Sequence, residues 1–261
     1  MDMLVSEIFS SNPIFVDIYG FCGLSMMSEY MPYGDTEKVA QPVFERGEPF
    51  ELDERSAALN DLLPGAKLTW ALEMAEAVQF LHNYKDGVIV HDDIQLAQFL
   101  LQENGHLKIN DFNRAEPMLF DVENQEYCRY RNNPGHGDWR SPEEYFDYPL
   151  NEKIDIWSLG NNFFAMLTGL SPFPHVPNHD GVKKRLMRNE TATIDPIWHE
   201  QSFAERKLAE IIPLCWKIDP DERIDISSLV KLLREAADEY ARMGGDKEEE
   251  QKDATTATDQ H

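Results

Sequence analysis

The chain has 261 residues, 42% of them hydrophobic, which is enough for the core of one domain of ordinary size. Its 48 acidic and 24 basic residues give a formal charge of −24, which repels polyphosphate backbones and argues against a nucleic-acid partner. Cys22, Cys128 and Cys215 are far apart and show neither a zinc spacing nor a disulfide framework, so we expect a reducing, cytoplasmic setting. No apolar run is long enough to cross a membrane, and no basic region of a signal peptide precedes the first apolar residues.

The first third of the chain predicts a hairpin, a connection and a helix. Residues 14–21 and 24–31 predict two short strands that meet at a tight turn. Residues 32–66 are rich in proline, glycine and acid, and they predict a long connection with room for one helix. Apolar residues at helical spacing then predict an amphipathic helix over 65–84.

The remainder predicts two more strands and then helices. Short strands are expected after Gly87 and within 106–112, and residues 113–140 have the character of a polar loop. From Gly244 the acidic, threonine-rich chain predicts a disordered tail. A proline at position 213 should kink or shorten the third of four helices. Those helices are expected at 152–168, 179–189, 202–217 and 225–242.

Five short motifs follow these elements in order, and together they resemble the eukaryotic protein kinase family. They are "HDDIQLAQFLL" (91–101), "INDFN" (109–113), "SPEEY" (141–145), "DIWSLG" (155–160) and "CWKIDPDER" (215–223). The resemblance covers roughly residues 12–242. It implies an α+β, protein-kinase-like fold with a mostly helical C-terminal lobe. The implied divisions are a remnant of the small β lobe with the hinge (1–34), the C-terminal lobe (35–243) and the acidic tail (244–261).

The resemblance assigns catalytic and metal-binding roles. Asp93 matches the aspartate that accepts the substrate hydroxyl proton, and Gln95 stands where Ser/Thr kinases have a lysine. Asp111 matches the principal Mg²⁺ ligand, while Gln98 replaces the asparagine that holds a second Mg²⁺. Asp92 replaces an arginine that pairs with an activation-loop phosphate, and an aspartate there would repel that phosphate.

Phosphorylation of the usual kind is not expected to activate this chain. The sequence between Asp111 and Ser141 contains no serine or threonine, and its only hydroxyls belong to Tyr127 and Tyr130.

Other matches concern the nucleotide and the scaffold. Ser28 is the gatekeeper by position, Glu29 to Met31 form the hinge, Asp35 falls where a ribose-contacting acid often lies, and Leu100 matches the residue beneath an adenine. Asn113 replaces a glycine and tolerates positive φ. The structural matches are His91 and Phe112 with Ile18 in an apolar stack, the Glu143–Arg223 ion pair, and Asp155 as anchor of the catalytic loop.

The front of the family pattern is missing from this sequence. It has no G-x-G-x-x-G and no lysine before Lys38, and no match to the helix glutamate that pairs with such a lysine. We therefore expect weak or absent binding of ATP and Mg²⁺. We also expect the strands around Phe15, Ile18, Phe21 and Met26 to expose an apolar face and a bare edge that favour self-association.

Three functions were weighed. A pseudokinase that binds a protein partner needs only the residues that hold the fold, and these survive best. Active phosphoryl transfer to a protein hydroxyl is the alternative, if an N-terminal lobe lies upstream. A metal phosphohydrolase, prompted by the His91-Asp92 pair, lacks further His and Asp ligands and is disfavoured.

Overall fold

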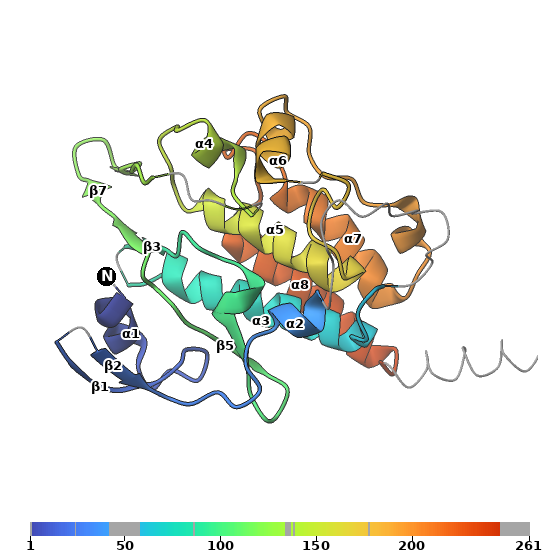
Figure 1. The fold of residues 1–261 in the computed structure, drawn as a ribbon, viewed down its shortest axis with the longest axis horizontal. Helices are drawn as coiled ribbons and strands as arrows, with labels where there is room; N and C mark the ends of the chain where they lie inside the picture. The colour runs from blue at the N-terminus through green and yellow to red at the C-terminus, as the bar shows by residue number, and fades with distance from the viewer. Residues whose placement is uncertain are drawn as a thin grey trace, which may run out of the picture.

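The computed structural model describes residues 2–23, 25–41, 58–85, 87–133, 137, 139–176 and 178–245. Long helices occupy one part of the molecule, and a short helix and a hairpin occupy the other (Figure 1). The arrangement confirms the predicted α+β class. The expected tail from residue 246 onward and the middle of the expected connection, residues 42–57, lie outside the described residues.

Four long helices form the larger part of the molecule. They are α3 (Pro64–His82), α5 (Lys153–Thr168), α7 (Phe203–Cys215) and α8 (Ile226–Arg242). Every residue of α5 from Ile154 to Thr168 is buried, and α5 packs against α7 and α3. The predicted position of α3 is confirmed, but its amphipathic character was wrong. Buried residues surround most of α3 because α8, α7 and α5 all contact it.

Two glycines allow the chain to pack tightly around α5. A Cβ at Gly160 would lie 2.7 Å from Cys215 Cβ, so only glycine permits α5 and α7 to approach this closely. Gly169 ends α5 with a φ of 80°, and a Cβ there would lie 2.7 Å from Leu59 Cβ. The backbone N–H of Leu59 donates to Thr168 O at 2.9 Å, which fixes the connection before α3 against the end of α5.

The N-terminal part consists of α1 (Asp2–Phe9) and an antiparallel hairpin of β1 (Ile18–Cys22) and β2 (Ser25–Ser28). The hairpin was predicted, with longer strands. The expected exposure of Phe15 was wrong. This side chain is fully buried, and its ring stacks on Phe9 with centroids 4.4 Å apart. Phe21 (55%) and Met26 (40%) are exposed as expected.

Short paired strands connect the two parts and carry the loops of the site. β3 (Val88–Val90) pairs with β6 (Glu116–Met118), and β4 (Phe99–Leu101) pairs with β5 (Leu107–Ile109). β7 (Phe120–Asp121) pairs with β8 (Glu126–Tyr127). The expected polar loop over 113–140 was therefore wrong in part, because three of these strands lie within it. The short helix η2 (Leu96–Gln98) leads into β4.

The remaining described helices are α2 (Glu37–Ala40), α4 (Pro142–Tyr145), α6 (His179–Leu186) and η3 (Pro196–His199). Of these, α6 was predicted and α2 lies in the connection with room for one helix, whereas α4 and η3 were not predicted. α6 ends three residues before the predicted end at 189. Pro213 lies in the last turn of α7, which ends at Cys215 rather than at 217, in agreement with the predicted shortening.

Candidate functional site

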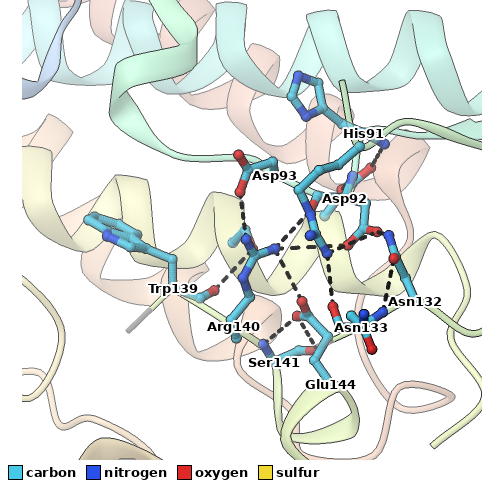
Figure 2. Close-up of polar contacts among 12 residues, drawn as sticks. His91, Asp92, Asp93, Asn132, Asn133, Trp139, Arg140, Ser141 and Glu144 are labelled. Atoms are coloured by element: carbon cyan, nitrogen blue, oxygen red, sulfur yellow. Dashed lines mark hydrogen bonds and ion pairs between the residues drawn. The ribbon is translucent and has the colours of Figure 1, made fainter. Parts of the chain in front are cut away.

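The carboxylate of Asp93 lies in the loop between β3 and η2, and both of its oxygens are engaged. Arg140 Nη2 donates to Oδ1 at 2.7 Å (Figure 2). Gln95 Nε2 and Gln98 Nε2 each donate to Oδ2 at 3.3 Å. The structure thus brings Asp93, Gln95 and Gln98 together. It turns the amide of Gln98 toward Asp93.

Asp155, near the start of α5, holds the backbone of the same loop. Its Oδ2 accepts from the N–H of His91 at 2.8 Å, and its Oδ1 accepts from the N–H of Asp92 at 3.0 Å. His82 Nε2 of α3 lies 2.8 Å from Oδ2. One buried carboxylate therefore fixes the loop against two helices, as the sequence led us to expect of this residue. Asp92 takes a φ of 60°, a strained value that this anchoring supports.

The side chain of Asp92 is buried and faces donors from the segment after β5. Asn132 Nδ2 donates to Asp92 Oδ2 (Figure 2). Arg114 Nη2 lies 3.5 Å from the same oxygen. Burial raises the pKa of Asp92 to about 6, although Arg114 and Asn132 act in the opposite direction. Asp92 thus pairs with Arg114 of the segment that follows β5.

Arg140 is the centre of this group and was not singled out from the sequence. Its Nη1 donates to the backbone O of Asp92 at 2.7 Å and to Glu144 Oε1 at 3.3 Å. Burial alone would lower the pKa of Arg140, but the carboxylates of Glu144, Asp93 and Asp92 raise it. Burial raises the pKa of Glu144 to about 7, despite the nearby Arg140 and hydrogen bonds from Ser141.

A cavity of about 390 Å³ lies between α1, the hairpin and β4–β5; we call it the hinge cavity. Five of the residues predicted to bind nucleotide or metal line it: Ser28, Glu29, Met31, Leu100 and Asp111. Ser28 is exposed and not shielded as a gatekeeper would be. Asp35 is not among the lining residues. Its Oδ1 accepts from the N–H of Glu37 at 3.0 Å, at the start of α2.

Asp111 and Phe112 both line the hinge cavity but differ in backbone conformation and burial. Asp111 lines the hinge cavity and takes a φ of 60°. The positive φ expected at Asn113 is therefore carried by Asp111 instead. Phe112 is buried, and its backbone N–H donates to Asp2 Oδ1 of α1 at 2.9 Å.

An aromatic stack continues from Phe112 on both sides. The ring of Phe112 lies 5.2 Å from that of His91 and 5.9 Å from that of Phe15. The expected third member, Ile18, is half-buried and lines the hinge cavity. Phe15 continues this stack of rings toward α1.

Glu143 and Arg223 form a buried ion pair far from the cavity. Arg223 Nη1 and Nη2 donate to the two carboxylate oxygens of Glu143 at 2.7 and 3.1 Å. Arg223 also donates to the backbone oxygens of Lys153 and Lys217, and its guanidinium lies 5.2 Å from the Trp157 ring centroid. Such a geometry satisfies most of the donors of a buried arginine.

A family model of the protein kinase domain matches residues 17–232. The chain belongs to the protein kinase family. The matched range starts just before the hairpin and ends within α8, so it includes the loop of Asp93 and the lining of the hinge cavity except Asp2, Ser6 and Val16.

Curated kinases resemble this domain at moderate identity. A protein of Dictyostelium discoideum named "Probable inactive serine/threonine-protein kinase" is 29% identical over 202 residues, 74% of this chain and 16% of that protein. "Probable serine/threonine-protein kinase nek2" of the same organism is 30% identical over 61% of this chain and 35% of its own length. Chicken vascular endothelial growth factor receptor 1 is 31% identical over 70% of this chain and 13% of the receptor. The chain thus spans only a minor part of each of these relatives.

Kinase domains generally use ATP and Mg²⁺, and this one contains part of the expected set. Asp111 lines the hinge cavity, whereas Gln98, the second expected Mg²⁺ ligand, is not among the lining residues and donates through Nε2 to Asp93. Within the described residues no group of three His, Cys, Asp or Glu side chains is placed to hold a metal. No helix in the described part of the chain is long and apolar enough to cross a membrane.

Three functional side chains of the kinase domain were missed from the sequence: Arg140, Arg114 and Asp2. Arg140 directly precedes the "SPEEY" motif, and Arg114 directly follows "INDFN". Two features of the sequence could have pointed to these arginines. Each lies next to a motif, and each has the charge that would pair with Asp92 or Asp93. Asp2 precedes every motif, so only its fold position brings it to Phe112.

Proposed function

We propose that this kinase domain is a protein-binding or regulatory module with weak or no ATP-dependent phosphoryl transfer. The observation that carries the proposal is the charge of the hinge cavity. Its walls include the carboxylates of Asp2, Glu29 and Asp111, and among the described residues that line it there is no lysine or arginine. Lys108 pairs with Glu29 at 2.6 Å from outside the lining, so the uncompensated charge is that of Asp2 and Asp111. A triphosphate needs cationic groups to offset its charge, and here it would meet carboxylates.

The state of Asp93 supports the same proposal. A catalytic base must reach the hydroxyl whose proton it accepts. Both carboxylate oxygens of Asp93 already accept hydrogen bonds, from Arg140, Gln95 and Gln98, so a substrate hydroxyl has to compete with these donors. Loss of one preorganised charge contact in a kinase-like site typically costs on the order of 10²–10³ in rate.

The scaffold, in contrast, is intact. Asp155 anchors the loop, and the Glu143–Arg223 pair is buried and bidentate. A binding module requires a rigid surface and no phosphate cradle. The similarity to a relative whose name includes the word inactive adds support. We include in the proposal the division into a hinge remnant (1–34) and a helical lobe (35–243).

Nucleotide titration tests the proposal directly. We expect ATP with Mg²⁺ to raise the melting temperature of the purified chain by less than about 1 °C at millimolar concentration, since stabilisation follows the ratio of ligand to Kd. A Kd in the low micromolar range would overturn the proposal. Asp111→Asn serves as the matched control, because it removes the candidate Mg²⁺ ligand and keeps the side-chain volume.

The alternative is ATP-dependent phosphoryl transfer to a protein hydroxyl by a longer protein that contributes a glycine-rich loop and a lysine. It is favoured by one observation: Asp111 and the hinge residues share one cavity, and Phe112 packs inward beside them. The test is a phosphotransfer assay on the protein encoded by the longest natural transcript. Activity that is lost in its Asp93→Asn variant would establish the alternative. Equal signals from both proteins would rule it out.

A further inference from the structure

One guanidinium fills a site made by three carboxylates from two separate segments. Arg140 Nη2 lies 2.7 Å from Asp93 Oδ1, and its Nη1 lies 3.3 Å from Glu144 Oε1 and 3.9 Å from Asp92 Oδ1 (Figure 2). Its Nη1 also donates to the backbone O of Asp92. We call Asp92, Asp93, Arg140 and Glu144 the loop cluster. The Arg140 side chain is 12% exposed, so most of the guanidinium is shielded from water.

The loop cluster depends on a planar cation. A guanidinium presents donors in several directions at once, whereas an ammonium is a compact point charge. Asp93 and Glu144 receive different nitrogens of Arg140, which matches the guanidinium shape. Asp92 Oδ1 is buried and, among the described residues, has no hydrogen-bond partner, so it faces the cation through charge alone. Without Arg140, three neighbouring carboxylates would share a poorly hydrated space.

The position of Arg140 also couples two parts of the site. Arg140 precedes the helix α4, whose capping box joins Ser141 and Glu144. Arg114, from the segment after β5, donates to Asp92 O and Asn133 O, at 3.1 and 3.2 Å. The segment that carries these two arginines is therefore held on the catalytic loop by charge.

We propose that the loop cluster is a guanidinium-binding site which the chain fills with its own Arg140, an autoinhibitory contact that closes Asp93. The ligand class is a guanidinium group, and a free Asp93 exists only when Arg140 has left. The inference goes beyond the proposed function, because it concerns the occupant of Asp93 and holds whether or not a nucleotide binds.

Chemical rescue tests the site. Arg140→Ala should lower the melting temperature by on the order of 10 °C, since it leaves buried carboxylates unpaired. Ethylguanidinium at low millimolar concentration should then restore at least half of the loss, with a saturable dose response. Ethylammonium, which carries the same charge without the planar fork, should restore little. The matched control is Arg129→Ala, because Arg129 lies on the same segment as Arg140 but is exposed and pairs with Asp221. It should shift the melting temperature by less than about 2 °C and show no rescue.

Carboxyl labelling tests the closure of Asp93. A water-soluble carbodiimide with an amine nucleophile should leave Asp93 unmodified in the wild-type chain and label it several-fold faster in Arg140→Ala. Ethylguanidinium should restore the protection. Mass spectrometry of the peptide that contains Asp93 gives the readout, and the exposed carboxylate of Asp147 (69% exposed) serves as internal reference.

Three results would overturn the proposal. They are equal rescue by ethylguanidinium and ethylammonium, rescue of Arg129→Ala as well, and a folded Arg140→Ala with neither rescue nor faster labelling of Asp93. If Arg140→Ala does not fold, Arg140→Lys replaces it. The lysine keeps one charge but cannot reach both carboxylates, so Asp93 should label faster than in the wild-type chain. Wild-type labelling and stability in Arg140→Lys would contradict a guanidinium site.

Discussion

The loop cluster and the hinge cavity contain similar numbers of carboxylates but treat them differently. In the loop cluster, Arg140 lies between Asp93, at 2.7 Å, and Glu144, at 3.3 Å. In the hinge cavity, Asp111 accepts only a 3.4 Å hydrogen bond from the N–H of Asn113 among the described residues, and no lining cation faces it. Two aspartates of the kinase motifs therefore differ in their contacts. Asp93 forms an ion pair within the fold, whereas Asp111 makes only one long hydrogen bond among the described residues.

The largest effect on the free energy of unfolding is expected from the buried Glu143–Arg223 ion pair, which adjoins the loop cluster in sequence at Glu144. Glu143→Ala and Arg223→Ala should each lower the free energy of unfolding by about 3–5 kcal/mol, because each leaves the other charge buried. The double variant should lose less than the sum of the two. Urea denaturation of the four proteins gives the coupling. Additive losses would show that the two side chains are not energetic partners.

The loop cluster should also make stability depend on pH. The pKa values of Asp92, about 6, and Glu144, about 7, are raised above their ordinary values. Their contribution to stability is therefore fully present below about pH 4 and is lost as the pH rises through 6 and 7. The other charged and titratable groups that face them are Arg114, Tyr130, Arg140 and Asp155.

We expect the free energy of unfolding to fall by on the order of 2 kcal/mol between pH 5 and pH 8 from these two groups. Asp92→Asn and Glu144→Gln should each flatten that slope, as measured by denaturation at several pH values. A slope of the opposite sign over this range would contradict the raised pKa values.

A smaller effect is expected in the hinge cavity itself. Asp111→Asn should change the free energy of unfolding by less than about 1 kcal/mol, since asparagine tolerates the left-handed φ and few contacts are lost. Asp155→Asn is the matched variant on the other side of the comparison. It replaces an acceptor of three hydrogen bonds and should cost clearly more. Similar losses in the two variants would remove the contrast between the regions.

The smallest effect on stability should come from the hairpin surface. Phe21 is 55% exposed and Met27 is 63% exposed, so replacing both with serine should alter the free energy of unfolding by about 0.5 kcal/mol or less. If the hairpin mediates self-association, as we expect, the variant should scatter less light and bind less of an apolar dye. A wild-type chain that is monomeric over a wide concentration range would contradict that expectation.

The fold class was predictable because five short motifs occur in the family's order. The helices α5, α7 and α8 begin within one or two residues of their predicted starts, since apolar spacing marks them clearly. The strands β6, β7 and β8 were missed because two or three residues show no period. They exist through pairing with residues far away in the sequence.

The site was predictable only in part. Residue types placed Asp93, Asp111 and Asp155 in the right regions, because each lies in a motif. The sign of Asp92 led to an expectation of phosphate repulsion, but its actual partners are Arg114 and Asn132, which lie 22 and 40 residues away. Side-chain pairing over such distances follows from the tertiary fold and has no local sequence pattern.

The close approach of α5 and α7 at Gly160 has a practical consequence through Cys215. That thiol is buried under the approach, and burial raises its pKa to about 12, whereas Cys22 on the hairpin and Cys128 after β8 are exposed. A thiol reagent should therefore modify Cys22 and Cys128 quickly and Cys215 slowly. Cys215 should react only after the helical lobe has opened, so the rate of its modification reports the rate of global unfolding.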